Sequence, residues 1–301
     1  MNLALIQIRR ELWGNRGNFY IMIGILFAII VLASAVFGIA VGGGFTPAHP
    51  TGAASSEGVA MLGLGIGNFI FLFYALGLLG YLSGALYDDR KDGSVLFWRS
   101  LPVSDTATVA GKVLMAGIVG PLFVWIAVVI GHLIALFAIA TAASARGAEG
   151  FTVFASPGAL FGTWVFFAYA LLIQALWWLP YYGWLLFVSA ISPRGHPLIW
   201  AFLPPVLAGV VEMIAFRTSV VFQFLASHLA VSPIFNGWPA VTINTSMDQP
   251  LTESMASANP LYTGSGWVSH FLAMPSMWIG LAIGLGLLAL AVAARRYSAT
   301  S

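Results

Sequence analysis

Six long apolar segments, separated by short polar or small-residue stretches, dominate the pattern of this chain. They cover residues 19–41, 61–86, 113–143, 158–191, 198–216 and 271–294. A helix needs roughly 20 apolar residues to cross a bilayer, so each segment predicts a membrane-spanning helix. The third and fourth exceed that length and are expected to tilt, kink or protrude. Pro180, inside the fourth, predicts a kink because it removes a backbone hydrogen bond.

Two further stretches predict helices that do not cross. Residues 1–18 interleave apolar and charged side chains, a pattern typical of an amphipathic helix on the inner membrane surface. An ordinary basic flank of the first span explains the same residues equally well. Residues 217–270 begin with an apolar run that is too short for two crossings. We expect a re-entrant outer segment there, which must be covered by protein or line a cavity.

The distribution of lysine and arginine orients the predicted spans, because cytoplasmic loops carry an excess of both. With the N-terminus inside, only Arg146 and Arg217 lie on the outer side. The inner side then holds Arg9, Arg10, Arg16, Arg90, Lys91, Arg99, Lys112, Arg194, Arg295 and Arg296. Both termini are therefore expected to be cytoplasmic.

Composition places the chain in the same class. Of its 301 residues, 60% are hydrophobic and only 7% are charged, whereas soluble domains carry about 25% charged residues. We therefore expect a single all-α polytopic membrane domain over residues 1–301, with no cleaved signal peptide. The net charge of +2 does not indicate nucleic acid, because the basic residues lie at membrane edges. The absence of cysteine excludes disulfides and thiolate metal sites.

Residues 87–112, between the second and third predicted spans, hold eight of the charged residues, of which the chain has 12 basic and 10 acidic. A charged cluster at 88–92 comes first, Pro102 later stops any helix, and Ser104 with Asp105 can cap the next one. Residues 94–101 predict a short amphipathic helix exposed to the cytosol, with an apolar surface that another protein can bind. We name this stretch the docking segment. It consists of Ser94, Val95, Leu96, Phe97, Trp98, Arg99, Ser100 and Leu101.

This order resembles that of the membrane subunits of ABC-2-type ATP-binding-cassette transporters. The matching features are Asp92-Gly93-Ser94, the run Leu96-Phe97-Trp98-Arg99, the sequence Ser100-Leu101-Pro102-Val103-Ser104, and Lys112. The six predicted spans, the surface helix before the first span and the outer re-entrant segment are similar as well. The resemblance covers the whole chain in layout and residues 87–112 in motif.

The resemblance implies that the docking segment is a coupling helix, which inserts into a groove of a separate ATPase subunit. Its charged rim would be Asp88, Asp89, Arg90, Lys91 and Asp92. Two ATPase subunits would bind ATP and Mg²⁺ and drive export by alternating access. The second permease subunit would be another copy of this chain or a related one, in a bacterial inner membrane.

The chain itself is not expected to be an enzyme. Its only Gly-Lys pair is Gly111-Lys112, and Thr106 stands where a phosphate-binding loop needs glycine. Its five histidines are scattered, so no metal site is expected. Four polar residues in the predicted spans are candidates for a substrate path, although helix packing explains them too. They are Asn68, His132, Gln174 and Glu212, the last of which Arg217 could balance at the membrane interface.

Two groups of residues have a structural and a functional interpretation. The aromatic group Trp177, Trp178, Tyr181, Tyr182 and Trp184 favours an interfacial belt, with a cavity wall as the alternative. The glycine pairs 63/67, 80/84 and 280/284 allow close helix contacts, within the chain or between subunits.

Two other functions stay open. The first is an ATP-driven mechanical or membrane-remodelling complex that moves no solute. The second is an ion-coupled secondary transporter, which would need paired buried charges in the middle of the membrane. An intramembrane enzyme is disfavoured because the spans lack convergent polar residues. The substrate does not follow from the sequence.

Overall fold

The computed structural model describes residues 56–91, 104–145, 147, 149–155, 157–193, 197–230 and 271–298. All regular elements in these ranges are helical, and five of the helices are long and apolar enough to cross a membrane: Leu62–Lys91, Asp105–Ser144, Leu160–Trp177, Pro197–Ala215 and Pro275–Tyr297. The predicted all-α membrane class is therefore confirmed. The amphipathic segment 1–18, the first predicted span 19–41 and the docking segment 94–101 lie outside the described residues, so the six-span topology stays a prediction.

The chain divides into two compact units, which are described separately. Unit one comprises Met1–Arg9, Leu76–Val119 and Ala170–Ser301, and unit two comprises Arg10–Ala75 and Gly120–Tyr169. Helices α4 (Ser56–Lys91) and α8 (Pro157–Trp177) contribute residues to both units.

Unit two has its core where the start of α4 meets α7 (Gly120–Ser144), the short 3₁₀ helix η2 (Gly150–Ala155) and the start of α8. The buried residues of this core are Val59, Leu136, Ala140, Val153 and Leu160. The first glycine pair brings these helices close together: a Cβ on Gly63 would lie 2.6 Å from the His132 ring, and one on Gly67 would lie 2.2 Å from the Phe167 ring. This pair therefore serves packing within the chain.

The third predicted span is one helical run from Asp105 to Ser144, with a π turn inside it. It starts as α6 (Asp105–Leu114), where the side chain of Ser104 accepts a hydrogen bond from the Ala107 N–H at 3.1 Å. The predicted cap at Ser104 is therefore confirmed. The π turn, η1 (Met115–Val119), lies just before Pro121. Proline has no N–H and crowds the carbonyl four residues earlier, and a wider turn relieves that crowding.

The fourth predicted span is broken at Trp178, as the proline predicted. Helix α8 ends at Trp177, and α9 (Leu179–Ile191) begins with Pro180 in its first turn. Proline is tolerated at that position because the first N–H groups of a helix have no partner within the helix. The break gives α9 a direction of its own.

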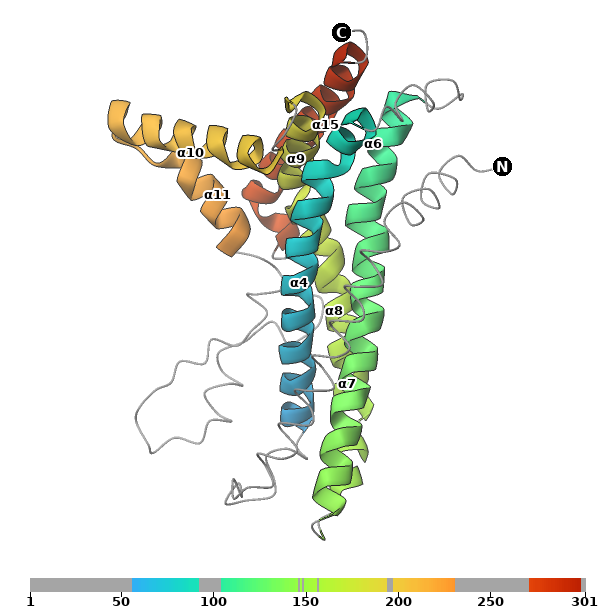
Figure 1. Ribbon diagram of the computed structural model, residues 1–301. Coiled ribbons are helices and arrows are strands. Elements are labelled where there is room, and N and C mark those ends of the chain that lie inside the picture. The colour runs from blue at the N-terminus through green and yellow to red at the C-terminus, as the bar shows by residue number, and fades with distance from the viewer. Residues whose placement is uncertain are drawn as a thin grey trace. The chain divides into compact units, whose positions relative to one another are not determined.

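In unit one, α9 packs against α15 (Pro275–Ser298) through glycine (Figure 1). A Cβ on Gly183 would lie 2.6 Å from the Gly284 carbonyl oxygen, and one on Gly284 would lie 2.7 Å from the Leu179 carbonyl carbon. The backbones therefore approach as closely as small residues permit. At Gly80, by contrast, a Cβ would meet nothing within 4 Å.

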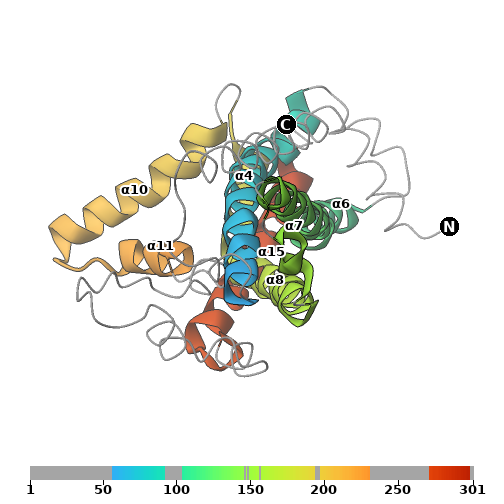
Figure 2. The same cartoon turned by 90° about the horizontal axis from the view of Figure 1, so that it is seen from below.

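Helices α10 (Pro197–Ala215) and α11 (Val220–Ala230) lie beside each other (Figure 2). The apolar side chains of α10 are largely exposed, and Ala201 and Gly209 are its buried residues. An exposed apolar helix suits lipid. Helix α11 is described over 11 residues, up to the point where the described part of this segment stops. Its depth in the membrane stays a prediction.

A larger side chain in place of glycine tests the close contact between α9 and α15. Replacement of Gly284 by valine would push α15 away from Leu179, and overpacking of this kind costs about 1–3 kcal/mol of the free energy of unfolding. Thermal unfolding in detergent measures this loss. Gly286→Val is the matched control on the same helix, because its Cβ would meet nothing within 4 Å. Equal losses for both variants would contradict the contact.

Candidate functional site

The two ends of the connection that contains the docking segment are described, although the docking segment and Asp92 are not. Helix α4 ends at Lys91, and α6 begins at Asp105 after the Ser104 cap. The charged side chains at these two ends are therefore the part of the predicted site whose geometry the structure defines.

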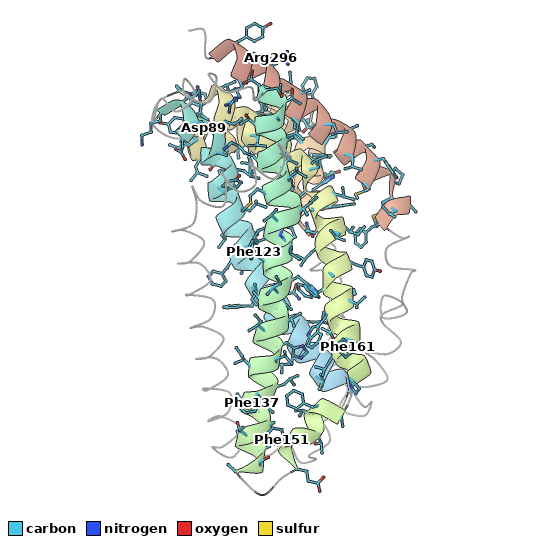
Figure 3. The ribbon with its side chains drawn as sticks, turned by 90° about the vertical axis from the view of Figure 1, so that its right-hand side faces the viewer. Asp89, Phe123, Phe137, Phe151, Phe161 and Arg296 are labelled. Atoms are coloured by element: carbon cyan, nitrogen blue, oxygen red, sulfur yellow. The ribbon has the colours of Figure 1, made fainter. Side chains whose placement is uncertain are left out.

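Four charged side chains of unit one form a compact network at these helix ends. Arg295 Nε donates to Asp105 Oδ1 at 2.9 Å, and Arg295 Nη1 donates to Asp89 Oδ2 at 3.2 Å. Lys112 Nζ lies 3.6 Å from the same Asp89 oxygen. We name Asp89, Asp105, Lys112 and Arg295 the charge network. Figure 3 shows Asp89 toward the end of the molecule where α15 finishes, near Arg296.

Each member of the charge network is placed by its helix. Asp105 stands in the first turn of α6, where a carboxylate is favoured by the helix dipole, and Arg295 stands in the last turn of α15, where a cation is favoured. Lys112 follows Asp105 by two helical turns and so shares its face of α6. Asp89 lies near the C-terminal end of α4, which disfavours an anion, and the two cations compensate for this.

The two cations of the charge network are buried and its two carboxylates are half-buried, which makes its charge balance important. The exposed fraction of the side chain is 4% for Lys112, 7% for Arg295, 12% for Asp89 and 21% for Asp105. Removal of one partner from a buried ion pair is strongly destabilising, because the other charge stays buried without compensation. Arg295 contacts both carboxylates. Without it, Asp89 and Asp105 would lose the guanidinium group that joins them.

A second set of bonds joins the end of α4 to the end of α9. Arg90 Nη2 donates to the carbonyl oxygens of Ser189 and Ser192, at 2.8 and 2.9 Å. These carbonyls belong to the C-terminal end of α9, where carbonyl groups lack partners within the helix, so Arg90 acts as a cap. In return, the Ser189 hydroxyl oxygen accepts from the N–H groups of Leu86 and Tyr87, both at 2.9 Å.

The predicted docking rim therefore contains residues of two kinds. Asp88 and Lys91 are exposed, as a rim for a partner requires. Asp89 and Arg90 are bound to α6, α9 and α15 within unit one. The sequence reasoning missed this inward role. The available signal for this role was the position of Lys112 and Arg295 next to long apolar runs. A charged side chain there must either reach water or pair with an opposite charge.

The four candidates for a substrate path are divided between the two units. Asn68 and His132 belong to unit two, and Gln174 and Glu212 belong to unit one. Asn68 donates to the Leu64 carbonyl of its own helix at 3.0 Å, and the buried His132 accepts at Nδ1 from Trp164 Nε1 at 3.2 Å. A shallow apolar depression of about 430 Å³ in unit two is lined by Leu133, Ile134, Phe137, Ala138 and Phe154, and none of the four candidates lines it.

Glu212 caps the N-terminus of α11. One carboxylate oxygen accepts from Thr218 Oγ1 at 2.6 Å and from the Val220 N–H at 2.7 Å, and the other accepts from the Val221 N–H at 2.9 Å. The turn before α11 contains Arg217 in the left-handed conformation, with φ 54°. Glu212 thus satisfies helix-end N–H groups, instead of the expected balance with Arg217.

The aromatic group holds the other end of α11. Trp177 Nε1 and Trp178 Nε1 donate to the His228 carbonyl oxygen at 3.1 and 3.3 Å, and the Tyr181 hydroxyl donates to the Leu225 carbonyl oxygen at 2.7 Å. Trp177 and Trp178 are buried, which differs from an interfacial belt.

No group of three histidine or acidic residues in the described part of the chain could hold a metal ion. The arrangement at the charge network offers no nucleophile or proton relay. What it can do physically is transmit displacement, because it fastens the ends of α4 and α15 to α6.

Removal of Arg295 tests the charge network. Arg295→Met removes a buried guanidinium from two half-buried carboxylates and is expected to lower the free energy of unfolding by about 1–3 kcal/mol, the usual cost of leaving a buried polar group without its partner. Arg296→Met is the matched control, since Arg296 is exposed on the next position of the same helix and surface substitutions usually change stability by about 0.5 kcal/mol or less. Chemical unfolding in detergent measures both. A loss no larger for Arg295 than for Arg296 would contradict the network.

Comparison with family models, with curated proteins and with solved structures found no match to this chain. The function must therefore be inferred from the residues and contacts described above.

Proposed function

We propose that this protein is the membrane-spanning permease subunit of an ABC-2-type ATP-binding-cassette transporter. It couples ATP hydrolysis by a separate ATPase subunit to export of a substrate by alternating access. The order of residues 87–112 and the apolar helices support this assignment. The observation that carries it is the charge network, which ties both ends of the connection containing the docking segment to α15.

The charge network gives the docking segment a mechanical role. The connection between α4 and α6 is held by Asp89 on one side and by Asp105 and Lys112 on the other, and all three belong to the network around Arg295. Separation of these groups would leave a buried charge without a partner, which is costly. A force on the docking segment is therefore passed to α4, α6 and α15 together, whereas a loop without anchors would absorb it.

The proposed cycle follows from this arrangement. A partner ATPase grips the apolar side chains of the docking segment, and the exposed Asp88 and Lys91 contribute to the charged rim. Two ATPase subunits close on ATP and Mg²⁺, and two docking segments move with them. The helix ends follow as rigid bodies and switch the path across the membrane. The second permease subunit is another copy or a related chain, and both termini lie on the cytoplasmic side of a bacterial inner membrane.

The rival functions differ in what they require. An ion-coupled transporter needs charges paired in the middle of the membrane. Here Asp89 and Arg295 lie in the last turns of α4 and α15, and Asp105 lies in the first turn of α6. This placement favours docking over ion coupling. A complex that uses ATP for mechanical work would use the same docking arrangement, and solute-stimulated ATPase activity of the reconstituted complex separates it from an exporter.

Substitution of the docking segment tests the proposal. Phe97→Asp combined with Trp98→Asp would remove the apolar surface and abolish co-purification with an ATPase that carries Walker motifs, while membrane insertion is retained. Phe97→Leu with Trp98→Phe is the matched control, which keeps the apolar character and should keep the partner. Normal co-purification of the aspartate variant, or no ATPase with the unaltered protein, would overturn the assignment.

A further inference from the structure

Two backbone N–H groups in the interior of α4 are capped by a side chain of another helix. The N–H groups of Leu86 and Tyr87 both donate to the Ser189 hydroxyl oxygen, at 2.9 Å each. Ser189 is fully buried and belongs to α9. One side-chain oxygen that accepts from successive backbone N–H groups is the arrangement found at a helix N-terminus. Here it occurs within the continuous helix Ser56–Lys91.

The residues just before this point weaken the helix locally. Ser83, Gly84 and Ala85 are small, and the Ser83 hydroxyl donates to the Gly80 carbonyl oxygen at 3.0 Å. Hydrogen bonds from a serine hydroxyl to a carbonyl of the preceding turn often bend a helix. Glycine in a helix interior lowers helix stability by about 1 kcal/mol relative to alanine. A side chain that enters the hydrogen-bond ladder is a recognised cause of a kink. Three features that favour bending therefore coincide within residues 83–87.

The residues after this point are fastened to other helices. Arg90 binds the terminal carbonyl groups of α9, and Asp89 belongs to the charge network. Residues 86–91 are thus bonded to the end of α9 and to α15. The preceding part of α4 continues into them through the weakened residues 83–87.

We propose that Ser189 turns residues 83–87 into a hinge, so that residues 88–91 form a lever that changes its angle against the rest of α4. The N–H groups of Leu86 and Tyr87 have alternative acceptors four residues back, the carbonyls of Leu82 and Ser83. Exchange between the two sets of acceptors keeps the number of hydrogen bonds constant, which allows two helix geometries of similar free energy. The role of the lever in energy coupling rests on the proposed function, whereas its existence is independent of that function.

Spin labels on both sides of the hinge test it in the full-length chain. The chain has no cysteine, so Leu76→Cys and Lys91→Cys, both at exposed positions, can be labelled without background. A straight helix would place these Cα atoms about 22 Å apart, at about 1.5 Å per residue. In lipid nanodiscs we expect a distance distribution with a population shorter than this value, measured by double electron–electron resonance.

Two variants and a matched control decide the outcome. Ser189→Ala removes the cap, and Gly84→Ala stiffens α4 without touching Ser189; both should shift the distribution toward the straight-helix distance. Gly84→Ala should be tolerated, because its Cβ would meet the Asp88 carboxylate, the mobile end of an exposed side chain. Ser192→Ala is the control: Ser192 is buried near the same end of α9, and its hydroxyl makes no hydrogen bond. It should leave the distribution unchanged.

A single straight-helix distance in the unaltered protein, or the same distribution in all variants, would overturn the hinge. The distance measurement needs no partner, so it stands whether or not an ATPase binds. With the partner ATPase, Ser189→Ala should keep binding but lower substrate-stimulated ATP hydrolysis at least about tenfold, equivalent to about 1.4 kcal/mol of coupling. Absence of ATPase binding by the unaltered protein would contradict the proposed function alone.

Discussion

The contact of Arg295 with Asp89 and Asp105 is the constraint on which the rest of unit one depends. It joins the end of α15 to the end of α4 and the start of α6, with Lys112 as the second cation. Because its two cations are buried, loss of either carboxylate partner is costly. Arg90 and Ser189 extend it to α9 through bonds to backbone groups. Four helix ends are thereby fixed at the place where the connection with the docking segment leaves and returns.

Elsewhere in unit one, polar side chains satisfy backbone groups that the helices leave open. Glu212 accepts from the first N–H groups of α11. Trp177, Trp178 and Tyr181 donate to carbonyl oxygens in its second half. Backbone groups that cannot reach water need such partners. The helix interiors instead pack through small residues, as Gly284 does against α9. Unit one is therefore stabilised both by polar residues at helix ends and by glycine contacts in helix interiors.

Local signals in the sequence predicted local features well. The apolar runs predicted the described spans, Pro180 predicted the break between α8 and α9, and Ser104 predicted the cap of α6. Each of these depends on residues close together in the chain. The π turn before Pro121 is an exception, because a proline in an apolar run does not specify which kind of distortion relieves it.

Tertiary pairings could not be predicted in the same way. Asp105 and Arg295 are 190 residues apart, and nothing local distinguishes a carboxylate that faces a partner protein from one that faces a buried arginine. Asp89 and Arg90 were therefore assigned to the docking rim with their exposed neighbours. The roles of Glu212 and the tryptophans were predicted from their expected depth in the membrane. That depth does not reveal their contacts with α11.

A double-mutant cycle on Asp105 and Arg295 tests the central claim most directly. Asp105→Asn, Arg295→Gln and the double variant would be unfolded reversibly in detergent, and the free energy of unfolding compared across the cycle. Residues that share a buried ion-pair network are expected to show a coupling energy of about 1–3 kcal/mol. A coupling energy near zero would mean that the two side chains act independently, and that α15 is not tied to the flank of the docking segment.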